Sequence, residues 1–375
     1  MLAQITQAEI DKGLDALLDD YLAISPGDAA LIAYTPDSRD PAAQLIVALR
    51  SRGIPVTSIG MRPLEDPTFR SRLAAVVPQP DSFPGRFMVI VLEKSTMSHG
   101  RHFEAVLERY PRSRCTLCRV ISASDEFFAY AFNRSSETLA HRNAYLLERM
   151  LKSTRLRVTA DGGTDLEITL NNDAYEWISN RGARRDGGTF LLPAGEIATY
   201  PGSINGLLVA DGAFNANVTT AHDARLADHP ARVEIVDSKA VSFDCTDPTS
   251  RRLLELCFDR PHAHQVGELG FGTNDGIPRF IPMNSHINER RVGVHIGFGQ
   301  HNQRPDRGLH YADIHLDLIT DGARVWFDDD PEPLDLATFE APPTVHPKGI
   351  SGEDVYEVDC CGLVLNELGI AEIGE

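Results

Sequence analysis

The chain divides into two parts whose residue patterns favour different kinds of sheet. Between residues 6 and 122, segments with apolar residues at helical spacing alternate with short apolar runs typical of buried strands. Strands that alternate with helices favour a mostly parallel sheet covered on both faces. After about residue 154 the pattern changes to strands and turns, which favours an antiparallel or mixed β structure resembling a partly closed barrel.

These patterns place individual elements along the first part of the chain. Helices are predicted at 8–22, 41–52, 68–75 and 102–110, and strands at 30–35, 55–61, 86–92 and 115–121. Two further helices, 126–133 and 136–153, lead out of this region. The sequence therefore predicts an N-terminal α/β domain over 1–153 and a C-terminal β-rich, barrel-like domain over 154–375.

The composition restricts the class of partner. Asp and Glu number 54 against 36 Lys and Arg, a formal charge of −18, and no basic cluster of the kind that binds nucleic acid is present. The chain has neither the ~20-residue apolar stretch that spans a bilayer nor the apolar core of a secretory signal. Its six cysteines are too scattered for a disulfide framework. We expect a cytoplasmic protein with no nucleic-acid or membrane partner.

The α/β region offers no evident nucleotide site, because it lacks both GxGxxG and GxxxxGK[ST]. Histidines are instead crowded in the second part, where seven of the thirteen lie between residues 262 and 315. Histidine is the commonest metal ligand. In the run 314–317 (IHLD), His315 and Asp317 stand two residues apart in a predicted strand, so both side chains project from one face. This pair predicts a platform for a metal ion.

Three other predicted strands each carry one ionisable residue among apolar residues and glycines. They are His295 in 292–298 (VGVHIGF), Glu268 in 266–272 (VGELGFG) and Glu196 in 191–197 (LLPAGEI). Each one alone is most often a hydrogen-bonded core residue, but a carboxylate is rarely buried without a cation. One shared cation site explains all three, and the glycines allow close approach.

Three carboxylates and two imidazoles exceed the three protein ligands that a catalytic zinc site typically uses. The set suits two divalent ions about 3.5–4 Å apart with one carboxylate between them. Carbonyl polarisation and water activation are the chemistry of such sites. The sequence thus predicts hydrolysis of an amide or ester.

At these residues the sequence resembles the aminopeptidase T / aminopeptidase S family of metallopeptidases. The resemblance rests on 192–197 (LPAGEI) with Tyr200 and Pro201, 267–274 (GELGFGTN), 293–299 (GVHIGFG) and 314–317 (IHLD). It implies that Glu196, Glu268, His295, His315 and Asp317 hold two metal ions, Zn, Co or Mn. It also implies an α/β domain, a β-rich metal domain, a homodimer, and a short peptide or other small molecule as substrate.

One position departs from that family. A tyrosine stands there seven residues beyond the histidine of the third segment, and this chain has Asn302. Tyr311 and His301 are the candidates to take its place. If neither does, the chain is a metal-binding protein that has lost an ancestral activity.

The chain also resembles in fold the 2,5-dihydroxypyridine dioxygenases, a second branch of the same superfamily. These enzymes bind a single Fe(II) through two histidines and one aspartate. Their His-x-Asp corresponds to His315 and Asp317, but their other histidine falls at Glu268. His99 is placed like the N-terminal-domain histidine that they use as acid or base. The alternative function is therefore a ring-opening dioxygenase.

Four further residues are candidates for supporting roles. His262 and His264 precede Glu268 at even spacing and are candidates to orient its neighbours or to serve as alternative ligands. Arg290 and Arg291 precede the strand of His295, where a guanidinium can bind a substrate carboxylate through two hydrogen bonds.

Overall fold

The computed structural model describes residues 5–95, 97–182, 188–218, 220–348 and 350. They form two compact units. The first consists of Met1–Glu137 and Gly182–Ala194, and the second of Thr138–Arg181 and Gly195–Glu375. Within the described ranges, no helix is both long enough and apolar enough to cross a membrane.

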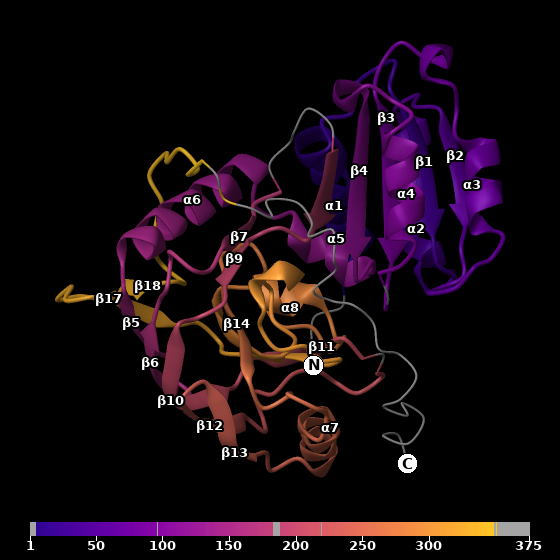
Figure 1. The fold of residues 1–375 in the computed structure, drawn as a ribbon. Coiled ribbons are helices and arrows are strands. Elements are labelled where there is room, and N and C mark those ends of the chain that lie inside the picture. Colours follow the sequence, from indigo (N-terminus) through magenta and orange to yellow (C-terminus); the bar gives the residue numbers. More distant parts are fainter. Residues whose placement is uncertain (1–4, 96, 183–187, 219, 349, 351–375) are drawn as a thin grey trace. The chain divides into compact units, whose positions relative to one another are not determined.

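The first unit contains a five-stranded parallel sheet with the order β2-β1-β3-β4-β8. Its strands are β1 (Ala29–Tyr34), β2 (Val56–Gly60), β3 (Phe87–Glu93), β4 (Cys115–Ile121) and β8 (Gly188–Leu192). Strands β3 and β4 are buried along their whole length, because helices cover both faces of the sheet (Figure 1).

The helices of this unit follow the predicted alternation. They are α1 (Gln7–Ala16), α2 (Arg39–Ser51), α3 (Phe69–Val76), α4 (Gly100–Leu107) and α5 (Asp125–Ala131). A π-helical turn, Leu17–Tyr21, extends α1, and short 3₁₀ turns occur at Pro36–Ser38, Pro80–Ser82 and Arg112–Arg114. The start of α1 is fixed by a capping box, in which Thr6 and Glu9 satisfy each other's backbone N–H groups.

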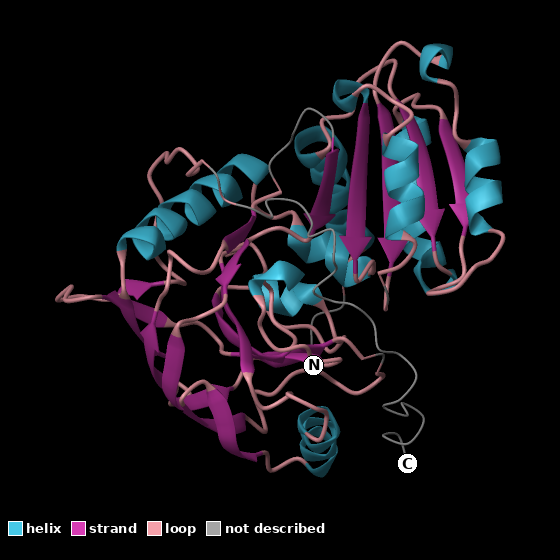
Figure 2. Cartoon of the chain, viewed as in Figure 1, coloured by secondary structure: helices cyan, strands magenta, loops and turns pink. Residues whose placement is uncertain are grey.

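The second unit is built from two antiparallel sheets (Figure 2). One has the order β13-β12-β10-β6-β5-β17-β18 and the other β11-β16-β15-β14-β9-β7. The first sheet comprises β5 (Arg155–Thr159), β6 (Asp165–Thr169), β10 (Ser203–Ala210), β12 (Ala231–Val236), β13 (Lys239–Asp244), β17 (Arg324–Phe327) and β18 (Leu334–Asp335). The second comprises β7 (Trp177–Asn180), β9 (Glu196–Thr199), β11 (Ala213–Ala216), β14 (Val266–Gly272), β15 (Gly293–Gly299) and β16 (His315–Ile319).

A single apolar core joins the two sheets of this unit, with side chains contributed by both. Three α-helices accompany them, α6 (Ser136–Lys152), α7 (Pro248–Phe258) and α8 (His286–Arg290), and a 3₁₀ turn occurs at Pro305–Arg307. The predicted fold class, an α/β part with a parallel sheet followed by a β-rich part, is confirmed.

The two compact units differ in two places from the domain division at residue 153 that the sequence predicts. From Thr138 on, α6 belongs to the second unit, because Leu146, Leu147 and Met150 are buried in that unit's core. Strand β8 belongs to the first unit, because it pairs with β4. Both differences arise from long-range contacts that spacing along the chain does not specify.

Candidate metal centre

Four adjacent strands of the second unit, β9, β14, β15 and β16, carry the five candidate ligands on one face. The cross-strand register sets Glu268 and Asp317 on either side of Gly297, and sets His295 opposite Gly270. Residues that alternate with these ligands, such as Leu269, point the other way into the apolar core. The period of two in the sequence therefore separates an ionisable face from a hydrophobic one.

Each ligand candidate has a glycine as a cross-strand partner. At two of these glycines, Gly270 and Gly297, the absence of a side chain leaves the space that ligand side chains occupy. A Cβ on Gly270 would lie 1.9 Å from Nε2 of His295. A Cβ on Gly297 would lie 2.8 Å from Oδ1 of Asp317 and 2.9 Å from Cε1 of His315. The imidazoles and carboxylates thus pack over bare backbone, as the glycine-rich strands predicted.

Gly270→Ala is expected to displace the imidazole of His295, which is buried and cannot move away into solvent. We expect overpacking to lower the free energy of unfolding by about 1–3 kcal/mol and metal affinity to fall with it. Urea unfolding and metal titration measure the two effects. Gly60→Ala, in β2, is the matched control, because its Cβ would meet nothing closer than 3.8 Å. Equal stability of the two variants would contradict the steric role of Gly270.

The five side chains form a continuous row in which Glu268 is central. Its Oε1 lies 3.5 Å from Nε2 of His295, and its Oε2 lies 3.8 Å from Nε2 of His315. At one end Nε2 of His295 lies 3.1 Å from Oε1 of Glu196. At the other end Nε2 of His315 lies 3.1 Å from Oδ2 of Asp317. The two oxygens of Glu268 therefore face two different imidazoles.

The chemistry of this row fits a divalent cation. Glu196, Glu268 and His295 each offer a ligand atom within 4.8 Å of the others. Among the described residues, three buried atoms make no hydrogen bond of acceptable geometry: Oδ1 of Asp317 and both ring nitrogens of His295, although Nε2 lies within ion-pair distance of Glu196. Buried polar atoms without partners are costly, and a bound cation would satisfy the oxygen and a ring nitrogen.

His315 is held in the tautomer that a metal ligand requires. Its Nδ1 donates a hydrogen bond to the backbone carbonyl of Gln300 over 2.7 Å, since a carbonyl can only accept. In neutral imidazole this leaves the lone pair on Nε2, the atom that faces Glu268 and Asp317. The backbone N–H of His315 also donates to Oδ1 of Asn217. Both contacts fix the ring against its strand.

Helix α8 packs against β11, β14, β15 and β16 and adds a buried charged pair to the site. Nη1 of Arg290 lies 2.7 Å from Oε1 of Glu196 and 2.8 Å from Oε2 of Glu289. Asn215, on β11, donates to the other oxygen of Glu289. Arg290 was predicted to bind a substrate carboxylate, but the structure places its guanidinium against two carboxylates of the protein.

Burial and charge shift the proton affinities of the row in different directions. Burial, reinforced by the charge of Glu289, raises the pKa of Asp317 to about 7 despite the nearby imidazoles. Burial also acts to lower the pKa of His295, but the carboxylates of Glu196, Glu268 and Asp317 outweigh it and raise that pKa well above its usual value. The cluster has more carboxylates than cations to balance them, which is the environment that favours a metal ion.

Two residues near the row were not among the sequence candidates. Burial opposes ionisation of Glu289, but the charges of His286 and Arg290 lower its pKa to about 2. Burial also lowers the pKa of His286, which interacts with Glu289, Arg290, Glu196 and His315. The sequence feature that could have indicated them is the capped helix start at Ser285, whose hydroxyl accepts from the N–H of Ile287.

The candidates to replace the missing tyrosine lie in different environments. His301 is buried, its ring meets Tyr200 edge-on, and burial together with the charge of His310 lowers its pKa. The His315 charge contributes to the same shift, so His301 is close to the row. Tyr311 is 73% exposed on the surface and is not part of the row. Asn302 is buried beside Gly267, whose carbonyl accepts its N–H.

The other supporting candidates have structural partners. His262 and His264 are exposed in the turn before β14, where Nδ1 of His264 donates to the carbonyl of Ala240. The guanidinium of Arg291 pairs with Asp321 and lies over the ring of Phe280. The structure therefore does not bring these three residues into the row.

His99 belongs to the first unit, where it precedes α4 with a left-handed backbone conformation, φ 61°. Its Nε2 donates to the carbonyl of Arg62 over 2.8 Å, and its ring packs on Phe69. These contacts hold His99 at the end of the parallel sheet where the carboxyl ends of the strands lie. Its catalytic role stays a prediction.

Comparison with known proteins supports the fold. A family model described as crocagin biosynthetic protein CgnE/B matches residues 200–327, a range that includes every member of the row except Glu196. A search of curated proteins found no match. The structure of 2,5-dihydroxypyridine dioxygenase from Pseudomonas putida KT2440 is similar with a TM-score of 0.58 at 13% identity, covering 92% of this chain and 99% of the dioxygenase.

Wild-type AmpT from Thermus thermophilus is also similar, with a TM-score of 0.52 at 14% identity, covering 88% of this chain and 98% of AmpT. The fold of this chain is therefore similar to that of both structures. One of these structures is of a dioxygenase and the other of an aminopeptidase, so the likeness shows the fold and does not distinguish between the two reactions.

Proposed function

We propose that this chain is a metal-dependent hydrolase of the aminopeptidase T type that acts on the carbonyl of a short peptide or a related amide. The observation that carries the proposal is the position of Glu268, whose two carboxylate oxygens face the imidazoles of His295 and His315. Glu196 and Asp317 extend the row on either side. Such a donor set suits two divalent ions with Glu268 between them.

When bound, divalent ions in such a site polarise a carbonyl oxygen and lower the pKa of water toward neutrality. Other residues of the chain hold the ligand side chains in the orientations that this chemistry requires. Gln300 fixes the tautomer of His315, and Arg290 fixes the orientation of the Glu196 carboxylate. The apolar face of the same strands anchors all the ligands to a rigid sheet.

Metal content is the direct test. We expect the protein to bind two equivalents of Zn, Co or Mn per chain, and its unfolding temperature to rise with metal and fall with chelator, because metal binds the folded state. Elemental analysis and thermal unfolding measure these effects, and release of product from aminoacyl anilides measures hydrolysis. A protein that takes up no divalent metal and melts identically with and without chelator would contradict the proposal.

A second candidate is a mononuclear Fe(II) ring-opening dioxygenase. The row contains two imidazoles together with carboxylates, and two histidines with one carboxylate form the ligand set of non-heme iron oxygenases. The similar fold of the dioxygenase agrees with this alternative. One Fe per chain and O₂ uptake dependent on an aromatic or pyridine-like acid would favour it over hydrolysis. The homodimer and the cytoplasmic location stay predictions.

A further inference from the structure

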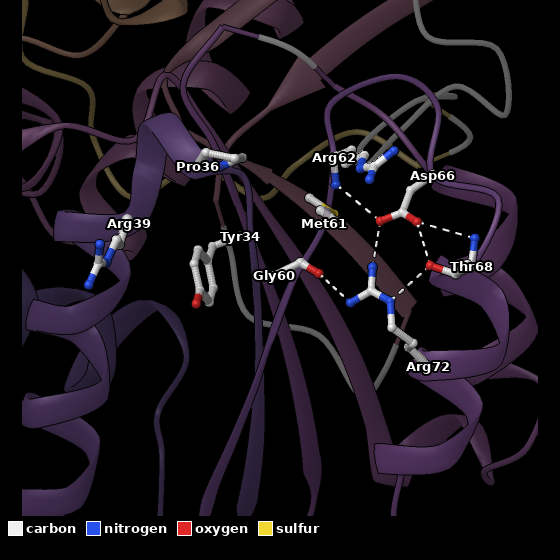
Figure 3. A pocket seen from close by; sticks show the side chains of 9 residues that line it. All are labelled: Tyr34, Pro36, Arg39, Gly60, Met61, Arg62, Asp66, Thr68 and Arg72. Carbon is white, nitrogen blue, oxygen red and sulfur yellow. Dashed lines mark hydrogen bonds and ion pairs between the residues drawn. The ribbon is translucent and has the colours of Figure 1, made fainter.

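The first unit contains a cavity of about 610 Å³, and none of the metal-centre residues is among the residues that line it (Figure 3). It is lined by the end of β1, the start of α2, the end of β2 and the segment that leads into α3. The carboxyl ends of parallel strands are where ligands of open α/β sheets bind. The volume lies within the range of small-molecule sites.

One wall of the cavity is a fixed ion pair between Arg72 and Asp66 (Figure 3). Arg72 donates to Oδ2 of Asp66, to the carbonyl of Gly60 over 2.8 Å and to the hydroxyl of Thr68. Asp66 is buried, but hydrogen bonds from Arg62 and Thr68 and the charge of Arg72 lower its pKa to about 2. It is therefore ionised and its charge is matched by Arg72.

Two other arginines line the cavity, Arg39 and Arg62, and Asp66 is the one acidic residue among the lining residues. In the part of the chain that the structure describes, no carboxylate forms an ion pair with either guanidinium. The cavity thus carries two positive charges beyond the Arg72–Asp66 pair, in a chain whose formal charge is −18. Local charge of this sign attracts an anion.

The backbone that carries these arginines is held in place. The N–H of Arg62 donates to Asp66, and its carbonyl accepts from Nε2 of His99. The turn before Arg39 is anchored by the buried Ser38, whose hydroxyl donates to the carbonyl of Leu92 over 2.6 Å. A preorganised site loses less entropy when it binds a ligand.

The remainder of the lining is less polar. The ring of Tyr34 is half-buried and packs near Gly60, and Met61, which also lines the cavity, is buried. We propose that this cavity binds a phosphomonoester, with the organic group against Tyr34 and the dianionic phosphate attracted by the two exposed arginines, Arg39 and Arg62, which lie on either side of Tyr34 (Figure 3). Guanidinium groups suit phosphate oxygens because of their forked donors.

Calorimetric titration of the full chain with phenyl phosphate, after removal of metal by chelation, tests the proposal. We expect saturable binding that weakens at high salt and is stronger than the binding of inorganic phosphate. Arg39→Ala and Arg62→Ala should both weaken binding: replacing the arginine that contacts the phosphate should weaken it about tenfold, the usual effect of losing a charged hydrogen bond, and replacing the other should weaken it less. Arg109→Ala, an exposed arginine of the same unit outside the cavity, should bind as the wild type does.

Glu268→Gln separates this site from the metal centre. Unchanged affinity for phenyl phosphate in that variant would support the cavity as an independent site. Loss of binding in Glu268→Gln, with binding retained in Arg39→Ala and Arg62→Ala, would overturn the proposal. Inorganic phosphate that binds as tightly as the ester would also overturn it, because Tyr34 would then have no role.

Discussion

Glu268→Gln should abolish loading of at least one metal ion and lower hydrolysis at least about 10²–10³-fold, the effect of losing one preorganised electrostatic contact. The substitution preserves shape and removes the charge from the centre of the row. Both His295 and His315 face this carboxylate, so its loss affects both ends of the site. An amide oxygen is also a poorer ligand than a carboxylate for a divalent ion.

Elemental analysis and aminoacyl anilide hydrolysis measure these two losses on the same preparation. Glu167→Gln is the matched control, because Glu167 is an exposed glutamate on strand β6 of the same unit. It should retain full metal content and activity. Wild-type metal loading in Glu268→Gln would remove Glu268 from the ligand set and leave the proposed function without its main support.

Arg290→Ala is expected to lower the free energy of unfolding of the metal-free protein by about 3–5 kcal/mol, because removing one partner of a buried ion pair leaves an uncompensated charge. Here two carboxylates, Glu196 and Glu289, lose the same cation. A bound metal ion would balance the charge of Glu196 in place of Arg290. The decrease in the free energy of unfolding should therefore be smaller in the metal-loaded protein. Urea unfolding with and without metal measures both quantities.

Arg251→Ala provides the comparison for a surface pair. Arg251 forms an ion pair with Asp244 in which both side chains are at least half exposed. Exposed pairs contribute about 0–1 kcal/mol, so this variant should unfold almost as the wild type does whether or not metal is present. An Arg290→Ala variant of similar stability would show that Arg290 does not compensate the buried carboxylates.

The strand positions of the candidate ligands could be predicted because their pattern is local. In β14 and β15 the alternation of glycine or ionisable residues with Leu269, Phe271, Val294 and Ile296 specifies which side chains face the core. A period of two also sets His315 and Asp317 on one face without knowledge of the neighbouring strands. The expected proximity of these two side chains is confirmed at 3.1 Å.

The contribution of α8 could not be predicted in the same way. It is a helix of five residues, too short for a periodic pattern, and Arg290 next to a predicted strand resembles an ordinary surface arginine. Only packing against β11 brings Asn215 to Glu289 and thereby fixes the Arg290 guanidinium. The exposure of Tyr311 could not be predicted either, because its position beside His310 in the sequence does not indicate where its side chain lies.

The sequence by itself determined the two kinds of sheet and the identity of the ionisable residues that the second unit buries, because period and residue type are properties of single segments. Tertiary structure decided the order of those residues in space. The registers of β14 with β15 and of β15 with β16 place Glu268 between two imidazoles, and α8 adds a buried arginine to the ionisable face. Register and packing are long-range properties, since they arise from contacts between segments far apart in the chain.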